Sequence, residues 1–395
     1  MDKQKMAVEA EKRLTTPAYV FDLDRFHRRF QYLKENLGEN MNVNYCMKTN
    51  PFLTRESLMD TDRIEVCSYG EFLICKELKI DPKRLLISGV LKKPEDMREI
   101  FQYCKDEAIY TAESPGQARV LQMVAKENHL FVNVYYRLHC GQFGMDENTI
   151  IELLGSEDYP NLLFYGIHYF TGTQKHKISK HAKEIKKLDE FFERIKGETG
   201  KEVLHLEYGT GFGVPYFANQ EETITNPEGL REFRQLLMAM KWKGKISLEM
   251  GRAIAYDCGY YIVKAMDIKE TAGKNIIICD GGIHQMNYDG QLRGMYKPHI
   301  TVVRKKQRLS EKKNYAIYGS LCTTNDVLVS EFASEEISEG DMIVFERVGA
   351  YSVYEGMSLF LSHELPGIGF YSEEDGFVVV RKQQESYRIN TPIYE

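Results

Sequence analysis

An alternation of short strand-like runs with helical segments, between about residues 40 and 250, most constrains the fold of this chain. The runs are rich in β-branched and aromatic residues, and the segments between them carry apolar residues at spacings of three and four. Eight βα units of this kind predict a (β/α)8 TIM barrel. A doubly wound sheet is the alternative, but no Gly-x-Gly-x-x-Gly follows the first run. The eight runs are Val43–Cys46, Ile64–Cys67, Leu85–Ser88, Ala108–Thr111, Phe131–Leu138, Leu162–Tyr169, Val203–Tyr208 and Ile246–Glu249.

Two helices stand out in the pattern. One precedes the first barrel strand, and we expect Asp24 to cap it and Gly38 to end it. Its apolar face consists of Phe26, Phe30, Leu33 and Leu37. The second helix is expected to stop at Gly197. Its apolar residues are Ile178, Ala182, Ile185, Leu188, Phe192 and Ile195.

Beyond about residue 268 the chain changes to strand-like runs without helices between them. This change predicts a smaller C-terminal β-domain, and the strand-like run Ala18–Asp22 is expected to join it. We therefore divide the chain into a barrel at 22–268 and a β-domain at 269–395 together with 1–21. The expected β-domain strands are Asn275–Cys279, Ile300–Lys305, Tyr315–Tyr318, Met342–Glu346 and Gly376–Arg381.

Composition excludes several classes of protein. A net charge of -6 and a pI near 6.0 argue against a nucleic-acid partner. No apolar run approaches the ~20 residues that span a bilayer, and the polar start Met1–Lys5 has no signal core, so we expect a cytoplasmic protein and no membrane contact. The eight cysteines have no zinc-ligand spacing, so we expect reduced, buried thiols and no metal.

Lys48 is the first candidate catalytic residue, because it follows the first barrel strand and precedes a Thr-Asn-Pro turn. A lysine at the carboxyl end of a barrel strand can be desolvated, which lowers its pKa and lets it attack a carbonyl. Most lysines at strand ends are simply solvated. The assignment therefore depends on what else lies at this end of the barrel.

Residues expected at the carboxyl ends of the other strands complete a site. Gly209, Thr210 and Gly211 form a glycine loop after the seventh strand, where barrels commonly bind phosphate. Glu249 ends the eighth strand. A carbonyl-trapping lysine, a phosphate loop and a deep carboxylate together describe a pyridoxal 5'-phosphate site, with the ring nitrogen on Glu249. The same end also carries Glu65, Ser68, Arg137, His168 and Arg252.

These residues lie in motifs that resemble the barrel-type (fold type III) pyridoxal phosphate-dependent decarboxylases, the group of diaminopimelate and ornithine decarboxylases. The resemblance covers nearly the whole chain and implies an alanine racemase-like barrel and a carboxy-lyase. It implies that Lys48 holds the cofactor as a Schiff base, that Arg252 and Tyr351 help to bind phosphate, and that Cys322 is the acid. In that family the cysteine comes from the second subunit of a head-to-tail homodimer. The matching stretches are Tyr45–Pro51, Val66–Glu71, Gly166–Gln174, Glu207–Gly213, Glu249–Arg252, Leu321–Asp326 and Gly349–Tyr351.

Departures from the family pattern bear on the ring and the substrate. Phe170 stands where the family has a ring-stacking histidine, and its π face can still stack on the cofactor, next to Thr173. His168 either binds the cofactor or is a satisfied core histidine. Thr323 stands where diaminopimelate and ornithine decarboxylases have an acid that binds a distal amino group. A hydroxyl cannot balance an ammonium, so we expect a substrate without one, in contact with Thr323, Asp326 and His284.

The stretches Asp280–His284 and Phe360–His363 resemble a subgroup that includes the butirosin-type decarboxylase, whose glutamyl substrate is tethered to an acyl carrier protein. The basic segment Lys175–Lys183, continued by Lys186 and Lys187, is a candidate docking face for such a carrier. A solvated helix face is the plainer interpretation of these charges.

Four other functions stay open at this point. Free diaminopimelate is an alternative substrate. An amino-acid racemase is disfavoured because Glu249 strengthens the cofactor's electron sink. A non-catalytic pyridoxal phosphate-binding barrel would lack the β-domain. A structural barrel with a buried Lys48–Glu249 pair would gain little stability from it.

Overall fold

The computed structural model describes residues 2–38, 40–288, 294–306 and 310–394. Packing divides the chain into two compact units. One, here called the barrel unit, comprises 29–214 and 222–253; the other, the β-unit, comprises 1–28, 215–221 and 254–395. The functional division at residues 22 and 268 stays a prediction. The units differ from it because the short segment 215–221 and the residues from 254 onward pack with the β-unit.

The barrel unit is a closed barrel of eight parallel strands, β2 to β9 in chain order, as the strand pattern predicts. β2 closes it by pairing with β9, with Asn44 opposite Glu249. Each strand lies within two residues of its expected bounds, because β-branched and aromatic runs buried on both faces mark it. The strands are Met41–Cys46, Arg63–Val66, Leu85–Ile87, Ile109–Ala112, Val132–Arg137, Leu162–Phe170, His205–Gly209 and Lys245–Met250.

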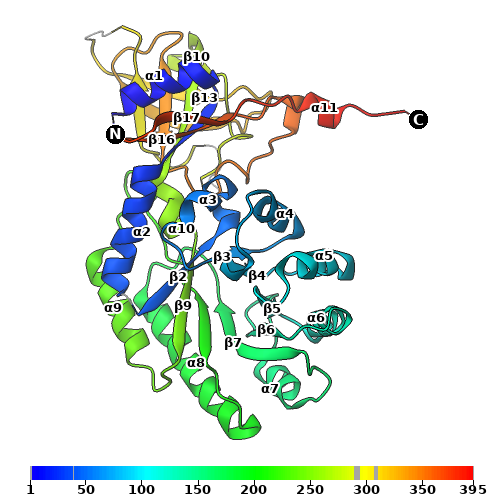
Figure 1. Ribbon diagram of the computed structural model, residues 1–395. Coiled ribbons are helices and arrows are strands. Elements are labelled where there is room, and N and C mark those ends of the chain that lie inside the picture. The colour runs from blue at the N-terminus through cyan, green and yellow to red at the C-terminus, as the bar shows by residue number, and fades with distance from the viewer. Residues whose placement is uncertain (1, 39, 289–293, 307–309, 395) are drawn as a thin grey trace. The chain divides into compact units, whose positions relative to one another are not determined.

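Helices surround these strands (Figure 1). Two expected helix ends are wrong. The Asp22 carboxylate, not Asp24, caps α2 by accepting from the Arg25 amide at 2.9 Å. α8 continues past Gly197 and ends at Gly200, which takes the left-handed φ of 69° that a glycine tolerates. The helices are α2 (Leu23–Leu37), α3 (Thr54–Ser57), α4 (Tyr69–Glu77), α5 (Pro94–Cys104), α6 (Pro115–Glu127), α7 (Glu147–Gly155), α8 (Ile178–Thr199), α9 (Pro227–Met238) and α10 (Arg252–Ala255).

The β-unit contains a nine-stranded mixed sheet, and β1 (Ala18–Asp22) lies inside it between β10 and β16, as expected. The sequence analysis missed β10, β14 and β16 and the helix α1 (Lys3–Leu14), whose Met6, Ala7 and Ala10 pack in a core with Val20. A short helix, α11 (Tyr387–Asn390), lies near the end of the chain. The remaining strands are β10 (Gly259–Thr271), β11 (Lys274–Cys279), β12 (Ile300–Val303), β13 (Lys313–Tyr318), β14 (Val327–Ser334), β15 (Met342–Glu346), β16 (Gly367–Ser372) and β17 (Gly376–Arg381).

The eight cysteines are free thiols, but the expectation that they are buried is wrong for three of them. Cys67 and Cys140 are half-buried and Cys322 is exposed. Within the described ranges, no helix is both long enough and apolar enough to cross a membrane.

Candidate active site

Lys48 follows β2 in the short 3-10 turn Met47–Thr49 at the carboxyl end of the barrel. Its Nζ lies 2.6 Å from Glu65 Oε2, a carboxylate at the end of the neighbouring strand β3. The Lys48 side chain is 40% exposed while that of Glu65 is 4% exposed, so the amine faces open space above a buried anion. The partner of Lys48 in the structure is therefore Glu65.

The protonation of this pair differs from the expectation for Lys48. Burial would lower the pKa of Lys48, but the neighbouring Cys67 and Glu65 raise it well above its ordinary value. Burial would raise the pKa of Glu65, but the Lys48 ammonium more than offsets this and holds it below the usual range. The prediction of a lowered lysine pKa is wrong for the protein alone, because an adjacent carboxylate favours the ammonium.

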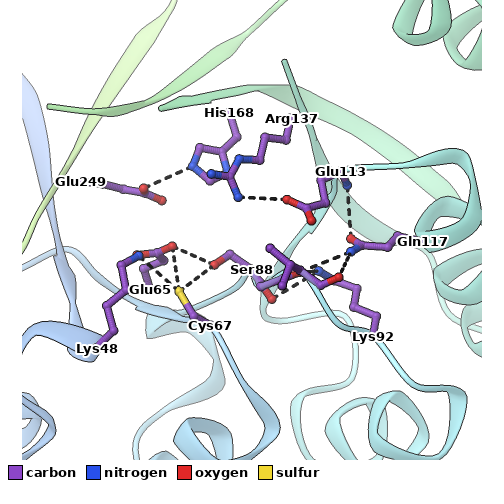
Figure 2. A network of polar contacts seen from close by, with 12 residues as sticks. Lys48, Glu65, Cys67, Ser88, Lys92, Glu113, Gln117, Arg137, His168 and Glu249 are labelled. Atoms are coloured by element: carbon purple, nitrogen blue, oxygen red, sulfur yellow. Dashed lines mark hydrogen bonds and ion pairs between the residues drawn. The ribbon is translucent and has the colours of Figure 1, made fainter. Parts of the chain in front are cut away.

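A hydrogen-bond network extends the pair to the next strand (Figure 2). Cys67 Sγ lies 3.3 Å from Lys48 Nζ and 3.1 Å from Glu65 Oε1. Ser88 Oγ, just after β4, donates to Glu65 Oε1 at 2.8 Å. The sequence analysis did not name Ser88 as a site residue, although its place at the end of the expected strand Leu85–Ser88 was the available signal.

The network continues through the loops after β4 and β5 (Figure 2). Lys92 Nζ donates to the Gly89 carbonyl at 2.8 Å, and Gln117 Nε2 donates to the Val90 carbonyl at 3.0 Å. Burial lowers the pKa of Lys92 to about 8. Arg137, at the end of β6, forms a 3.0 Å ion pair with Glu113 Oε2. Arg137 is thus placed at the predicted end of the barrel, held by an acid that the sequence analysis did not single out.

Glu249 and His168 form a second buried pair at this end of the barrel. Glu249 Oε2 lies 3.2 Å from His168 Nε2, and the two side chains are 5% and 1% exposed. Glu249 Oε1 and His168 Nδ1 have no hydrogen-bond partner in the described part of the chain. A buried polar atom without a partner costs free energy, and a protonated ring nitrogen would satisfy the carboxylate oxygen. The site therefore fits a pyridinium N–H at Glu249.

The glycine loop follows β8 and packs closely on its neighbours. A Cβ on Gly209 would lie 2.5 Å from the Phe170 ring, and one on Gly211 would lie 2.0 Å from the Gly172 carbonyl oxygen. Gly211 also has φ +56°, which disfavours other residues. Thr210 donates its amide to the Glu249 carbonyl at 3.2 Å, which fixes the loop to β9. Only glycine fits this close path, which is typical of loops that bring amides to an anion.

Three other predicted ligands lie at the same end of the barrel. Arg252 begins α10 and donates from Nε to Thr173 Oγ1 at 3.3 Å. Ser68 is exposed and caps α4, where its Oγ accepts the Glu71 amide at 3.1 Å. Arg252 and Thr173 thus join the loops after β9 and β7, whereas the cap accounts structurally for Ser68.

The predicted residues of the β-unit form a separate group. Cys322 is exposed, and Thr323 Oγ1 accepts the Asn325 amide at 3.3 Å. Asp326 is 1% exposed, and its carboxylate accepts the amides of Ile283 at 2.9 Å and Leu321 at 2.7 Å. Asp326 therefore braces the turn that carries Cys322.

His284 directly follows Ile283, whose amide Asp326 binds, and Tyr351 stands further along the β-unit. His284 is fully buried beside His363, with ring centroids 4.9 Å apart, and burial lowers its pKa to about 4. Tyr351 is half-buried with a left-handed φ of 64°. A non-glycine residue at such a φ costs free energy and often marks a functional position.

Three potential metal ligands also converge in the barrel. Cys46 Sγ and carboxylate oxygens of Glu65 and Glu249 lie within 4.8 Å of one another. Burial raises the pKa of the Cys46 thiol well above its ordinary value, and the Glu65 charge raises it further. A thiol must lose its proton to bind a metal. The raised thiol pKa therefore weakens Cys46 as a metal ligand.

A closed parallel barrel that brings a lysine, a buried glutamate and a glycine loop to one end has the arrangement of a pyridoxal phosphate enzyme. The family model for the pyridoxal-dependent decarboxylase, C-terminal sheet domain, matches residues 18–349. The chain belongs to this family and is a pyridoxal phosphate-dependent amino-acid decarboxylase, a carboxy-lyase.

Relatives with different substrates are similar to this chain at low identity. It is 25% identical to a diaminopimelate decarboxylase of Methanocaldococcus jannaschii, over 88% of this chain and 84% of the relative. It is 23% identical to an L-glutamyl-[BtrI acyl-carrier protein] decarboxylase of Niallia circulans, over 94% and 92%. It is 26% identical to a 2-[(L-alanin-3-ylcarbamoyl)methyl]-2-hydroxybutanedioate decarboxylase of Staphylococcus aureus, over 88% and 92%.

Solved structures share the fold. The crystal structure of the M. jannaschii diaminopimelate decarboxylase in complex with L-lysine superposes with a TM-score of 0.85 at 21% identity, covering 98% of this chain and 94% of that one.

Proposed function

We propose that this protein removes the α-carboxylate of an amino acid whose side chain has no distal ammonium. Lys48 would hold the cofactor's carbonyl carbon, and Glu249 would keep the ring nitrogen protonated. The amides of Gly209 to Gly211, together with Arg252 and Tyr351, would hold the phosphate. Support for the assignment to Glu249 comes from its buried Oε1, which has no hydrogen-bond partner among the residues that the structure describes. Further ligands of the cofactor would be Glu65, Ser68, Arg137, His168, Phe170 and Thr173.

When bound, pyridoxal phosphate supplies a ring that accepts the electron pair left by carbon dioxide. The residues of the proposed site would then have the following roles. Glu249 holds a proton at the ring nitrogen by its negative charge, and His168 orients that carboxylate from 3.2 Å. Phe170 offers an apolar face for the ring, half-buried above Gly209. Glu65 anchors the Lys48 amine when it is not bound to the carbonyl.

Cys322 would return a proton to the carbon that has lost carbon dioxide. The Cys322 thiol is exposed in the single chain, which supports a role for it in the site of another subunit. We propose that the enzyme is a homodimer in which Cys322 of one subunit completes the site of the other. Asp326 would act by holding the Cys322 turn, since its carboxylate already binds two amides.

The proposed substrate class rests on one observation in the Cys322 turn. Thr323 follows the cysteine, and its hydroxyl bears no charge that could balance an ammonium. The acid in the same turn, Asp326, is buried and occupied by backbone donors. A diamine-type substrate would therefore lose a charged hydrogen bond relative to a neutral-tailed one.

A substrate carried by an acyl carrier protein is a second candidate, favoured by α8. Lys177, Lys180, Lys183 and Lys186 are exposed where this helix begins, at the carboxyl end of the barrel. A basic surface at that end favours an acidic protein partner. Two lysines of the expected docking face do not belong to it. Lys175 is buried at 3% exposure and paired with Glu184, and Lys187 lies over the Tyr169 ring at 5.6 Å.

Carbon dioxide release tests the substrate class. Free diaminopimelate should be turned over at least tenfold more slowly than a neutral-tailed amino acid, and Thr323→Glu should narrow this ratio because it supplies the missing charge. Thr323→Gln is the matched control, since it adds size without charge. Efficient decarboxylation of free diaminopimelate by the unmodified enzyme would end the argument from Thr323.

Charge reversal tests the carrier. Lys177, Lys180 and Lys183 changed together to Glu should slow only the reaction of a carrier-bound amino acid, mostly through KM and with a strong salt dependence. Lys196, Lys201 and Lys241, exposed near the amino ends of β8 and β9, give the matched control. Equal effects of the two triple variants would remove the docking face and leave the decarboxylase assignment intact.

A further inference from the structure

A buried polar cluster lies behind the glycine loop, outside the residues assigned above. Lys175 Nζ forms a 2.9 Å ion pair with Glu184 Oε2 of α8 and lies 3.2 Å from Thr171 Oγ1. Tyr208 donates its hydroxyl to the same carboxylate oxygen, and His181 Nδ1 lies 2.8 Å from the Tyr208 hydroxyl. The Lys175 and Glu184 side chains are 4% and 13% exposed.

The cluster ties two active-site loops together through the backbone of Lys175. Its amide donates to the Gly211 carbonyl at 2.8 Å, and its carbonyl accepts the Gly213 amide at 2.9 Å. Next to it, Gln174 Oε1 accepts the Val214 amide at 2.9 Å while Gln174 holds a left-handed φ of 52°. The loop after β7 and the glycine loop after β8 are thus paired like two short strands.

The side chain of Lys175 explains why this pairing keeps one geometry. A Cβ on Gly211 would lie 2.8 Å from Lys175 Cε, so the lysine stem runs directly along the glycine loop. Its ammonium is then held by Glu184, which belongs to the long helix α8. Burial would raise the pKa of Glu184, but the Lys175 charge and the hydrogen bonds from Thr171, Tyr208 and Lys175 lower it on balance, which favours the carboxylate. Burial lowers the pKa of Lys175, although Glu184 acts against this.

A buried ion pair rarely adds net stability over an apolar pair of similar size, because both charges lose their hydration. Its value lies in direction, since an ammonium held 2.9 Å from a carboxylate fixes the lysine side chain and the backbone that carries it. In Lys175 this backbone contacts Gly211 and Gly213. The cluster is therefore placed to set where the amides of the glycine loop point.

We propose that Lys175 and Glu184 are positioning residues that hold the glycine loop in the conformation that binds the cofactor's phosphate. The inference rests on the proposed function, in which Gly209 to Gly211 receive that phosphate. Neither residue touches the cofactor in this role. Both act through the two backbone hydrogen bonds of Lys175.

The test compares two ligands that differ only in the phosphate. Apoprotein variants Lys175→Met and Glu184→Gln are titrated with pyridoxal 5'-phosphate and with pyridoxal, and each Kd is measured from the absorbance change. Affinity for pyridoxal phosphate should fall at least tenfold in both variants. Affinity for pyridoxal should change less than threefold, because its aldehyde contact with Lys48 does not depend on the loop. Lys196→Met, an exposed lysine near the other end of the same helix, is the control and should match the unmodified protein.

A single variant leaves one buried charge without its partner and can fail to fold. The double variant Lys175→Met with Glu184→Gln removes both charges and gives a second route to the same measurement. An equal loss of affinity for both ligands would show a general structural role. No loss of affinity for either ligand would show that the glycine loop keeps its conformation without Lys175 and Glu184. Either result overturns the proposal. Arg252→Gln distinguishes a failure of the positioning proposal from a failure of the proposed phosphate site. If this variant also leaves the ratio of the two Kd values, for pyridoxal phosphate and for pyridoxal, unchanged, the phosphate assignment itself is wrong.

Discussion

The Lys48 ammonium lies 2.6 Å from the Glu65 carboxylate in the part of the barrel where the cofactor carbonyl is expected. Burial alone would lower the pKa of Lys48, but the neighbouring Cys67 and Glu65 raise it well above its ordinary value. An ammonium cannot attack a carbonyl, so the proton must leave before the cofactor is held. We therefore expect the contact with Glu65 to slow the uptake of the cofactor.

Glu65→Gln should shift the pH profile of cofactor uptake to lower pH. A raised lysine pKa means that the neutral amine becomes more abundant as pH rises, so uptake by the unmodified apoprotein should accelerate with pH. Removing the Glu65 charge lowers the pKa of Lys48, so the variant should reach the same rate of uptake at a pH at least one unit lower. Stopped-flow absorbance over a range of pH measures this. Identical profiles for Glu65→Gln and the unmodified protein would show that Glu65 does not set the lysine's protonation.

Borohydride reduction of the loaded enzyme should attach the cofactor to a peptide that contains Lys48. Lys92 is the control, because burial lowers its pKa to about 8 and so increases its neutral, nucleophilic form. Mass spectrometry of the digested protein distinguishes the two. A label on Lys92 alone would transfer the catalytic role to it.

Glu249→Arg should leave cofactor bound but lower decarboxylation on the order of a hundredfold or more, because the ring nitrogen loses its proton. Glu207→Gln is the matched control. Burial and the Glu249 charge raise the pKa of Glu207 well above its ordinary value, which disfavours its charged form, and its carboxyl group accepts from Asn44 at 2.7 Å. Steady-state kinetics should show a change below tenfold for this control. Equal turnover of both variants and the unmodified enzyme would place Glu249 away from the ring.

Mixed dimers should reveal shared sites. Lys48→Ala is expected to be inactive and Cys322→Ala impaired, and subunit exchange between them should restore up to a quarter of normal activity, since one site in each hybrid has both residues. The exposed Cys322 thiol offers an independent check, because dimer formation should slow its alkylation. If exchange is verified and activity does not return, Cys322 serves its own subunit or no site at all.

Stability should fall as pH decreases from about 6.5 to 4. Burial lowers the pKa of His181 to about 4 and, together with His363, that of His284 to about 4. The unfolded chain binds more protons in this window, so each histidine removes up to about 3 kcal/mol as pH falls. His284→Leu should flatten the dependence, because neither ring nitrogen of His284 has a hydrogen-bond partner among the described residues. Urea unfolding at several pH values measures it, and a curve as steep as that of the unmodified protein would contradict the assignment.

The barrel was predictable from local pattern, because a strand buried on both faces leaves a continuous apolar run that few other structures produce. The β-unit was less predictable. β10 is buried in its first half and mostly exposed in its second, and β14 mixes buried and exposed residues without regular alternation, so neither has a clear strand pattern. α1 is defined by a core that includes Val20. The capping residue of α2, Asp22, and the end of α8, at Gly200, also depended on the local backbone conformation.

The sequence by itself determined which residues stand at strand ends, and hence the positions of Lys48, Arg137, His168 and Glu249, because a parallel barrel turns chain order into a common edge. Only the tertiary structure decided what each of them contacts. Glu65 rather than Glu249 pairs with Lys48, and this contact reverses the expected direction of the lysine's pKa. Lys175, one charge of a basic run in the sequence, is buried against Glu184. Electrostatic effects depend on distances between side chains, which neighbouring positions in a chain do not specify.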